Sequence, residues 1–252
     1  MSTRLEGRSA IITGAGGGIG RAMALAFANE GARVSMFDIE TAGLEESAEL
    51  VKAVSGVATP IVVDVTDRAA YSAAIDSVAA AQGGVDILVS NAMWIRYEPM
   101  ADVSEETLER MLAIGIKAVF WGMQAVAPHM AKRGKGAIVN MSSPASVHGI
   151  PNAAIYCAIK GAVSALTRQA AVELGKSGIR VNAVAPGPTM TPGAMRVVDE
   201  DGWKRRAART PSGRLSTPDE IALLAVFLAS DDSGCVSGDV LFGDGGRSIS
   251  AL

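Results

Sequence analysis

A tyrosine and a lysine stand four residues apart, at Tyr156 and Lys160, in a stretch with a helical pattern. Residues four apart share one face of an α-helix, so their side chains are neighbours. A nearby ammonium group favours the phenolate form of a tyrosine and lowers its pKa from about 10. A phenol tuned in this way can exchange a proton with an alcohol or ketone oxygen near neutral pH. The alternative is a chance spacing in a helix whose lysine reaches solvent.

Two serines, Ser142 and Ser143, directly follow the apolar run 136–141. In a doubly wound sheet, ligands bind outside the carboxyl ends of the strands. A serine hydroxyl at such an end could hold the reacting oxygen of a substrate. The alternative is an ordinary loop serine.

A glycine-rich turn, Thr13-Gly14-Ala15-Gly16-Gly17-Gly18-Ile19-Gly20, lies between an apolar run and a helical pattern. Glycines let the backbone approach a pyrophosphate, and the helix N-terminus supplies N–H groups and a favourable dipole. Asp38 ends the next apolar run, where an acidic residue accepts hydrogen bonds from an adenosine ribose. Its carboxylate would repel a 2′-phosphate, and neither Ile39 nor Glu40 is basic. This pattern favours NAD over NADP.

The elements around these residues alternate between short β-branched runs and longer helical patterns, which indicates βαβ units and a parallel sheet. The runs are apolar throughout, as expected when helices cover both faces. We therefore predict an α/β fold, a doubly wound parallel sheet of Rossmann type with about seven strands, in a single domain over 1–252. The expected strands are 9–13, 33–37, 60–63, 85–89, 136–141, 179–184 and 240–242, and the expected helices are 20–30, 41–53, 67–81, 104–131, 153–175 and 218–229.

The segment 186–218 lacks a clear periodic pattern and contains five prolines, at positions 186, 188, 192, 211 and 218. A long irregular loop inside a compact domain is usually functional. We expect it to be a lid over the substrate.

Composition excludes several classes of function. The net charge of −3 provides no basic stripe for nucleic acid, and 4% aromatic residues provide few stacking platforms. Two cysteines and two histidines form neither a disulfide framework nor a metal-binding spacing, so no metal is expected and the protein is expected to be reduced and cytoplasmic. The apolar run 111–127 contains Lys117 and Gln124 and is predicted to be a buried helix, so no membrane association is expected.

Jointly, these motifs resemble the short-chain dehydrogenase/reductase family along the whole chain. The matching residues are Thr13-Gly14-x-x-x-Gly18-x-Gly20, Asp64-Val65, Asn91-Ala92, Ser143, Tyr156-x-x-x-Lys160, Pro186-Gly187 with Thr191, and Gly243-Asp244-Gly245-Gly246.

The resemblance implies a role for each matched residue. Tyr156 would be the general acid/base, Ser143 would polarise the substrate oxygen, and Lys160 would bind the nicotinamide ribose and lower the pKa of Tyr156. Other residues would bind the dinucleotide at its adenosine, pyrophosphate or nicotinamide parts: Gly14, Gly18, Ile19, Gly20, Asp38, Asp64, Val65, Asn91, Ala92, Pro186, Gly187 and Thr191. The family also implies a homotetramer in which the helices 104–131 and 153–175 pair across subunits.

The chain departs from the family at Gly115, where the family usually carries the asparagine of a catalytic tetrad. Glycine has no side chain to hold the water that links the lysine to solvent. We hypothesise that backbone carbonyls hold such a water instead. A second departure is Met93, at a position where the family prefers glycine.

The expected substrate pocket is mostly apolar and comprises Met93, Trp94, Pro144, Ala145, Ile150, Met190 and Trp203. The alternative for each is ordinary core or lid packing, and for Trp203 the two interpretations are about even. This lining favours a hydrophobic or cyclic secondary alcohol or ketone. The leading hypothesis is therefore an NAD-dependent oxidoreductase that interconverts a secondary alcohol and a ketone. The alternatives are a 3-oxoacyl thioester reductase and a non-catalytic dinucleotide-binding sensor.

Overall fold

The computed structural model describes residues 3–196 and 198–250. Seven strands form one parallel sheet in the order β3-β2-β1-β4-β5-β6-β7. The order reverses between β1 and β4, whose carboxyl ends therefore lie side by side with a crevice between their following loops. The strands are β1 (Ser9–Thr13), β2 (Arg33–Asp38), β3 (Val57–Val62), β4 (Ile87–Ser90), β5 (Gly136–Met141), β6 (Ile179–Pro186) and β7 (Val240–Gly243).

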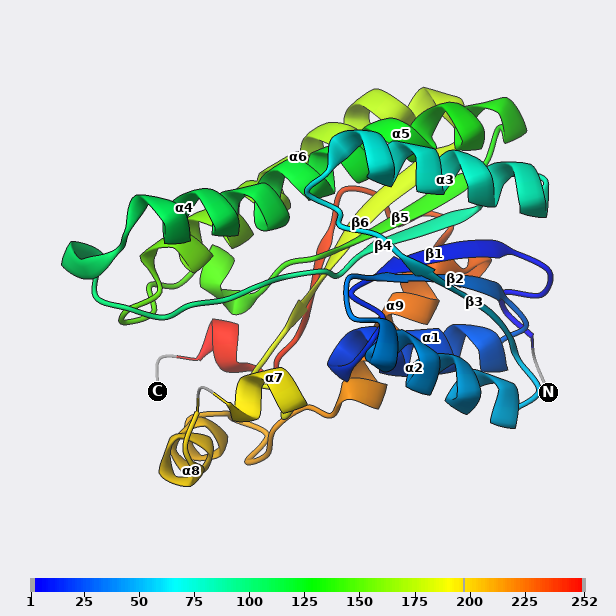
Figure 1. The fold of residues 1–252 in the computed structure, drawn as a ribbon. Coiled ribbons are helices and arrows are strands. Elements are labelled where there is room, and N and C mark those ends of the chain that lie inside the picture. Colours follow the sequence, from blue (N-terminus) through cyan, green and yellow to red (C-terminus); the bar gives the residue numbers. More distant parts are fainter. Residues whose placement is uncertain (1–2, 197, 251–252) are drawn as a thin grey trace.

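Helices cover both faces of the sheet, which confirms the doubly wound α/β fold (Figure 1). One face carries α1 (Gly18–Asn29), α2 (Thr41–Ala53) and α9 (Pro218–Ala229). The other face carries α3 (Arg68–Gln82), α4 (Glu105–Leu112), α5 (Ala118–Arg133) and α6 (Ala154–Leu174).

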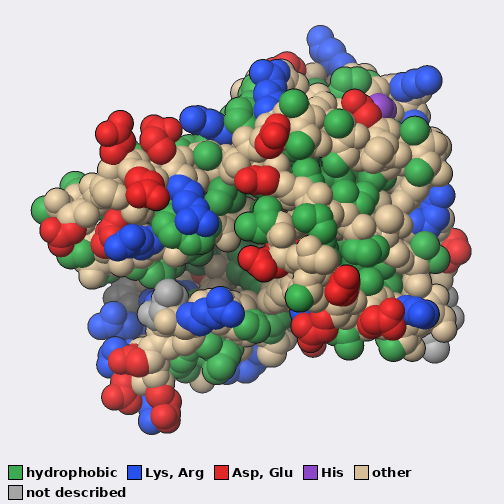
Figure 2. All heavy atoms as spheres, viewed as in Figure 1, with side chains coloured by type: hydrophobic (Ala, Val, Ile, Leu, Met, Phe, Trp, Pro, Cys, Tyr) green, Lys and Arg blue, Asp and Glu red, His purple; other side chains and the backbone are tan. Residues whose placement is uncertain are grey.

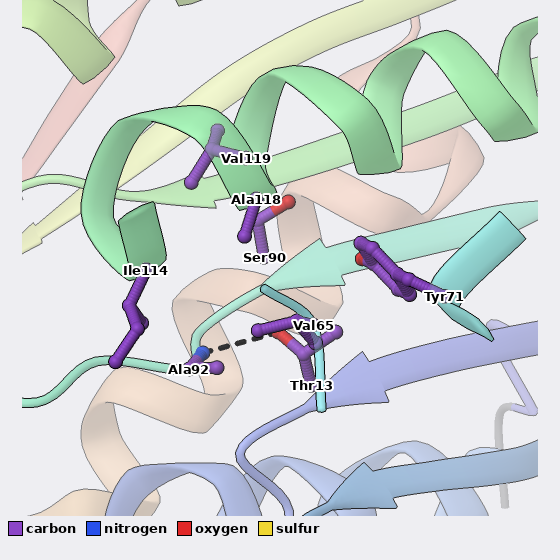
Figure 3. A pocket seen from close by; sticks show the side chains of 8 residues that line it. All are labelled: Thr13, Val65, Tyr71, Ser90, Ala92, Ile114, Ala118 and Val119. Atoms are coloured by element: carbon purple, nitrogen blue, oxygen red, sulfur yellow. Dashed lines mark hydrogen bonds between the residues drawn. The ribbon is translucent and has the colours of Figure 1, made fainter. Parts of the chain in front are cut away.

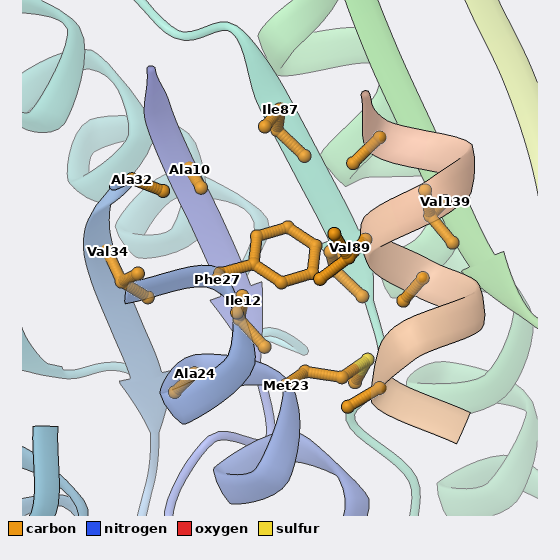
Figure 4. Close-up of a cluster of buried hydrophobic side chains, with 14 of the residues drawn as sticks. Ala10, Ile12, Met23, Ala24, Phe27, Ala32, Val34, Ile87, Val89 and Val139 are labelled. Carbon is orange, nitrogen blue, oxygen red and sulfur yellow. The ribbon is translucent and has the colours of Figure 1, made fainter. Parts of the chain in front are cut away.

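The core forms on the two faces of the sheet. Between the sheet and α1, Phe27 and Met23 pack on Ile12 and Val89 with no exposed surface (Figure 4). On the other face, Ile11, Leu88 and Ile138 pack beneath α3, α5 and α6. The inner strands β1, β4 and β5 are buried along their whole length, whereas β3 is an exposed edge strand that accommodates Pro60.

The predicted helix 104–131 is interrupted. Ser104 begins it as expected, its hydroxyl accepting a hydrogen bond from the Thr107 N–H at 3.1 Å. The chain then widens into a π-helical segment, η2 (Ala113–Lys117), between α4 and α5. By length and composition alone, the helical stretch Glu105–Arg133 could cross a membrane. Here α5 packs against α3 and the sheet, and helices in the core of a globular protein pass the same test.

The segment 186–218 is not irregular throughout, as the sequence suggested. It contains two short helices, α7 (Pro192–Met195) and α8 (Glu200–Ala208). Thr191 and Asp199 cap these helices by accepting hydrogen bonds from the N–H groups of Ala194 and Gly202. Both helices stand apart from the layered body, beyond the carboxyl ends of the strands (Figure 1).

Candidate active site

The glycine-rich turn follows β1 and is fixed to the end of β4. The Thr13 hydroxyl accepts hydrogen bonds from the N–H groups of Asn91 and Ala92, both at 3.0 Å, and donates to the Val89 carbonyl at 3.3 Å. The Asn91 amide Nδ2 donates to the carbonyls of Thr13 at 3.0 Å and Gly14 at 3.1 Å. Asn91 and Ala92 thus lie beside the turn, and their hydrogen bonds help to hold its conformation.

Two glycines of the turn have a left-handed backbone, with φ of +66° at Gly14 and +54° at Gly18. Only glycine adopts this region without strain. At Gly20 the limit is space instead, because an added Cβ would collide with the Gly14 carbonyl and with Nδ2 of Asn91. Ile19 packs against the core from the first turn of α1. The backbone conformation therefore requires glycine at Gly14 and Gly18, and the lack of space requires it at Gly20.

The N-terminus of α1 offers a fit for a pyrophosphate. Gly17 precedes the helix, and no side chain of the described residues caps it, so the first helical N–H groups have no partner there. A Cβ built on Gly17 would meet no atom within 4 Å. An uncapped helix N-terminus with open space before it is a favourable anion site.

Asp38, at the end of β2, lies against the glycine turn. Its Oδ2 accepts a hydrogen bond from the Gly16 N–H at 2.9 Å, and its Oδ1 accepts from the N–H groups of Ile39 at 2.8 Å and Glu40 at 3.1 Å. The one guanidinium bonded to this turn, that of Arg21, donates to the Gly16 carbonyl and pairs with Glu46 at 2.6 Å. The carboxylate is therefore held in place by the backbone.

Val65 lies at the same sheet edge and lines a cavity of about 10 Å³ below the turn (Figure 3). Asp64 is exposed beside it, and its Oδ1 accepts from the N–H and the hydroxyl of Thr66 at 2.8 and 2.7 Å. The cavity has room for about one water molecule, so a larger ligand would have to lie above it, in the crevice. Its lining residues are Thr13, Val65, Tyr71, Ser90, Ala92, Ile114, Ala118 and Val119.

Ser143, Tyr156 and Lys160 come together beyond the end of β5. Ser143 begins a short 3₁₀ helix, η3 (Pro144–Ser146), and its hydroxyl accepts from the Ala145 N–H at 3.2 Å. Tyr156 interacts with the Ser143 side chain, and Nζ of Lys160 lies 5.6 Å from the centre of the Tyr156 ring. The neighbouring Ser142 turns away and bonds Ser164 of α6 at 2.7 Å. Of the two serines, Ser143 is thus the one next to the tyrosine.

Lys160 is buried and donates from Nζ to the Met141 carbonyl at 2.6 Å. Burial lowers the pKa of its ammonium group to about 8. Burial also raises the pKa of the Tyr156 hydroxyl above its usual range, while the interaction with Ser143 lowers it. Lys160 is not among the groups that shift the Tyr156 pKa here, so the expected lowering by Lys160 is not seen, and desolvation, which disfavours the phenolate, dominates.

Gly115 lies in η2 against α6. A Cβ built on it would lie 2.5 Å from Cγ2 and 3.0 Å from Cδ1 of Ile159, the residue before Lys160. Ile159 has no exposed surface. The space beside Gly115 is thus filled by an apolar side chain of the helix that carries Tyr156 and Lys160.

Pro186 ends β6, and Gly187 and Thr191 follow it on the side of the glycine turn. The Gly187 N–H donates to the Gly243 carbonyl at 3.0 Å, and a Cβ on Gly187 would lie 2.7 Å from Cα of Asp244. A Cβ on Gly18 would lie 3.3 Å from Cβ of Thr191. The start of α7 therefore approaches the turn directly.

The expected pocket residues lie in different surroundings. Pro144 and Ala145 are buried beside Ser143, Met93 and Trp94 are partly buried in the loop after β4, and Trp203 is buried in α8. Ile150 and Met190 are 40% and 46% exposed.

Sequence reasoning missed Tyr97. Its ring lies edge-on to that of Tyr156, with 5.9 Å between the ring centres. Burial raises its pKa as well. Tyr97 belongs to an irregular loop after β4, where no periodic pattern indicates the direction of a side chain.

Within the described residues, no group of three or more His, Cys, Asp or Glu side chains could hold a metal ion. A groove of about 500 Å³ lies between the carboxyl ends of α3 and α5, lined in part by Asp76, His129 and Arg133. It sits at the amino end of β4, away from the tyrosine and the serine.

Comparison with known proteins agrees with this geometry. A family model described as enoyl-(acyl carrier protein) reductase matches residues 14–248. The chain is 39% identical over 246 residues to the 3-oxoacyl-[acyl-carrier-protein] reductase FabG of Thermotoga maritima, covering 98% of this chain and 100% of that protein. It is 38% identical over 246 residues to D-threitol dehydrogenase of Mycolicibacterium smegmatis, covering 98% and 95%.

Among solved structures, a gluconate 5-dehydrogenase from Burkholderia cenocepacia in complex with NADP and tartrate superposes with a TM-score of 0.94. Its identity to this chain is 36%, over 99% of this chain and 98% of that one. The match to a family model over nearly the whole chain, together with these relatives, shows that this chain belongs to the short-chain dehydrogenase/reductase family.

Proposed function

We propose that this chain is an NAD-dependent oxidoreductase that interconverts a secondary alcohol and a ketone. The observation that carries the proposal is the meeting of Ser143, Tyr156 and Lys160 at the strand ends, next to a glycine turn that fits a pyrophosphate. Bound nicotinamide dinucleotide supplies or accepts the hydride.

The protein's own residues move the proton. Ser143 donates a hydrogen bond to the substrate oxygen and holds it near the Tyr156 hydroxyl. Tyr156 gives its proton to that oxygen during reduction and takes it back during oxidation. Lys160, fixed by the Met141 carbonyl, places a positive charge beside the ring that favours the phenolate.

Asp38 supports NAD as the preferred dinucleotide. Its carboxylate would lie beside the adenosine ribose, where it can accept hydrogen bonds from the hydroxyl groups and would repel a 2′-phosphate. The gluconate 5-dehydrogenase relative was solved with NADP, so cofactor choice is expected to differ between the two proteins.

For the remaining cofactor residues we propose the roles that the family resemblance implies. Gly14, Gly18, Ile19 and Gly20 would surround the pyrophosphate, and the other residues would bind the two ends of the dinucleotide: Asp64, Val65, Asn91 and Ala92 at the adenosine side, and Pro186, Gly187 and Thr191 at the nicotinamide side. We also propose that Gly115 replaces a tetrad asparagine and that 186–218, with α7 and α8, acts as the substrate lid.

We further propose a cytoplasmic homotetramer that associates with neither nucleic acid nor membrane. Support for helix pairing across subunits comes from two exposed apolar residues, Phe120 on α5 and Val172 on α6, which are 46% and 82% exposed. Light scattering that gives one stable monomer would contradict this assembly.

The test is absorbance at 340 nm with NAD, then NADP, over secondary alcohols and ketones that include a 3-oxoacyl thioester. Tyr156→Phe should lower kcat by about 10²–10⁴-fold, because general acid/base catalysis contributes that much. Tyr97→Phe is the matched control, since it removes a neighbouring hydroxyl from the same aromatic pair. Turnover that survives in Tyr156→Phe would refute the assigned role.

The second candidate is a 3-oxoacyl thioester reductase, favoured by the 39% identity to a FabG reductase. A preference for the thioester over simple ketones would select it. Tight NAD binding with no turnover on any substrate would instead favour a non-catalytic sensor.

A further inference from the structure

Two arginines stand together at the edge of the candidate active site. Arg206 lies on α8, and Arg247 lies in the 3₁₀ turn η6 (Arg247–Ile249) after β7. Nη1 of Arg247 donates to the Arg206 carbonyl at 3.3 Å. The Arg206 guanidinium lies 5.4 Å from the centre of the Trp203 ring, which is buried in the same helix. Both arginines are thus held in place by contacts other than an ion pair with a described residue.

The turn that carries Arg247 is tied to the loop that follows Ser143. The carboxylate of Asp244 accepts hydrogen bonds from the N–H groups of Gly246 at 3.0 Å and Ser248 at 2.7 Å. The Ser248 carbonyl in turn bonds Nε2 of His148 at 2.9 Å. His148 lies five residues after Ser143, so these bonds tie the Arg247 turn to the loop that begins at Ser143.

The positive charge of Arg206 acts on the pKa of Tyr156. Burial raises the pKa of both Tyr156 and Tyr97, and Arg206 acts in the opposite direction on each. On the face shown in Figure 2, the surface is hollowed between the lobe of α4 and the lobe of α7 and α8. The lobe of α7 and α8 that borders the hollow carries Lys and Arg side chains as well as Asp and Glu side chains (Figure 2).

Within the described residues, neither Arg206 nor Arg247 forms an ion pair. The neighbours of Arg206 on α8 are paired, Lys204 with Glu200 at 2.8 Å and Arg205 with Asp199 at 3.7 Å. For Arg206 and Arg247, residues 3–196 and 198–250 offer no carboxylate at ion-pairing distance. Asp244 is the acidic group near Arg247, and both of its oxygens already accept from backbone N–H groups.

A third cation, Arg209, adds to the positive electrostatic potential at Arg247. Burial lowers the pKa of Arg247, and the charges of Arg206 and Arg209 lower it further. Like charges held close together at a partly buried site are unfavourable unless an anion joins them. A guanidinium presents two parallel N–H donors that match the two oxygens of a carboxylate.

We infer that Arg206 and Arg247 bind a carboxylate of the substrate, which makes the substrate a hydroxy acid or oxo acid. The carbon skeleton lies along the apolar side chains of the pocket, among them Pro144 and Met190, and its reacting oxygen lies between Ser143 and Tyr156. This inference rests on the proposed function and extends it, because the apolar lining alone favoured an uncharged substrate.

The first experiment compares matched substrates. 4-Oxopentanoate and its methyl ester differ only in the charge of one group, and both are offered with NADH. The acid is expected to have a kcat/KM about tenfold or more above that of the ester. Arg206→Gln should lower kcat/KM for the acid about ten- to hundredfold, mainly through KM, and change the ester less than about twofold. Arg205→Gln is the matched control, with the same residue type, helix and change in net charge.

Equal losses for acid and ester in Arg206→Gln, or no preference for the acid in the unmodified protein, would overturn the inference. Arg206→Lys keeps the charge but loses the planar pair of donors, so it should recover only part of the preference. Arg247→Gln should resemble Arg206→Gln in the size and direction of its effect.

A binding experiment separates this inference from the proposed reaction. Calorimetry measures hexanoate and hexanamide binding to the protein with NADH, in the unmodified chain and in Arg206→Gln. Hexanoate should bind about tenfold or more tighter than hexanamide, and this difference should disappear in the variant. That result without turnover on any ketone would retain the carboxylate site and refute the oxidoreductase proposal. Equal binding, or no binding of hexanoate, would refute the carboxylate site.

Discussion

Replacing Gly115 by alanine tests the close contact between η2 and α6. In a helix, alanine in place of glycine normally stabilises a protein by about 0.5–1 kcal/mol. At Gly115 the new Cβ would lie 2.5 Å from Cγ2 of Ile159, a distance that real Cβ atoms essentially never show. The same change is therefore expected to destabilise here.

The magnitude follows from the kind of contact. Ile159 is fully buried, so relief requires an unfavourable rotamer or a displacement of α6. Overpacking of this kind costs about 1–3 kcal/mol. For a chain of this length that corresponds to a fall in Tm of about 2–4 °C for each kcal/mol. A shift of α6 would also move Lys160, so kcat should fall as well.

The assay is thermal unfolding at one protein concentration, with Gly175→Ala as the matched control. Gly175 has helical backbone angles, φ −56° and ψ −38°, and a Cβ on it would meet no atom within 4 Å. The control should raise Tm slightly. Ile159→Ala removes the opposing atoms, so Gly115→Ala should cost little in that background, with a coupling of about 1–3 kcal/mol. Stabilisation by Gly115→Ala alone, or a cost that Ile159→Ala leaves unchanged, would refute the reasoning.

Three further predictions concern the cofactor site and the buried lysine. Asp38→Asn should lower the ratio of kcat/KM for NAD to kcat/KM for NADP by about tenfold, because the repulsion of a 2′-phosphate is removed. An unchanged ratio would show that Asp38 does not determine the choice of cofactor. Gly20→Ala should abolish NAD binding in fluorescence titration and lower Tm, since a Cβ there meets the Gly14 carbonyl, whereas Gly17→Ala, in open space, should leave Tm unchanged. Lys160 releases its proton at about pH 8 in the folded protein and near 10.5 when unfolded, so the unfolded state binds more protons between these values. Stability relative to Lys160→Met should therefore rise by about 1–3 kcal/mol from pH 8 to 10.5 in urea titrations, and a fall over that range would reverse the sign assigned to burial.

Much of the fold could be predicted from the sequence because strong local signals mark its elements. The bounds of β1, α2, β5 and α9 agree with the expected ranges residue for residue. At α9, Thr217 accepts a hydrogen bond from the Glu220 N–H while the Glu220 side chain accepts one from the Thr217 N–H, and this reciprocal cap fixes the start of the helix. The alternation of strands and helices, together with the right-handed connection of parallel strands, predicts a doubly wound parallel sheet, whereas the strand order itself comes from the structure.

Features that depend on contacts between distant segments could not be predicted in this way. The widening at η2 adds no periodic signal of its own, because the apolar pattern continues through it, and only the structure shows that its Gly115 lies against Ile159 of α6. Likewise, β3 begins at Val57 rather than at 60. Residues 57–59 pair with β2 at the exposed edge of the sheet, and they lack the apolar run that marks a buried strand.

The residues of the candidate site also fall into two groups: those in local sequence motifs, and those that only the fold brings to the site. The glycine turn and the pair Tyr156 and Lys160 are local motifs, so their spacing made them candidates, and the family resemblance implied their roles. Tyr97, Arg206 and Arg247 reach the same site from three separate segments. Each is a common surface residue type in an irregular or short element, and only the folded arrangement shows what it faces.

The bonds that Thr13 and Asn91 make to the glycine turn have a consequence for how tightly a dinucleotide can be held. Fixing the backbone of one residue costs about 1–2 kcal/mol of conformational entropy. Because hydrogen bonds within the protein fix this turn, the entropy is lost when the chain folds. A dinucleotide then binds to a preorganised surface. Weakening Thr13 would therefore appear as a loss of ligand affinity even though its hydroxyl is fully occupied within the protein.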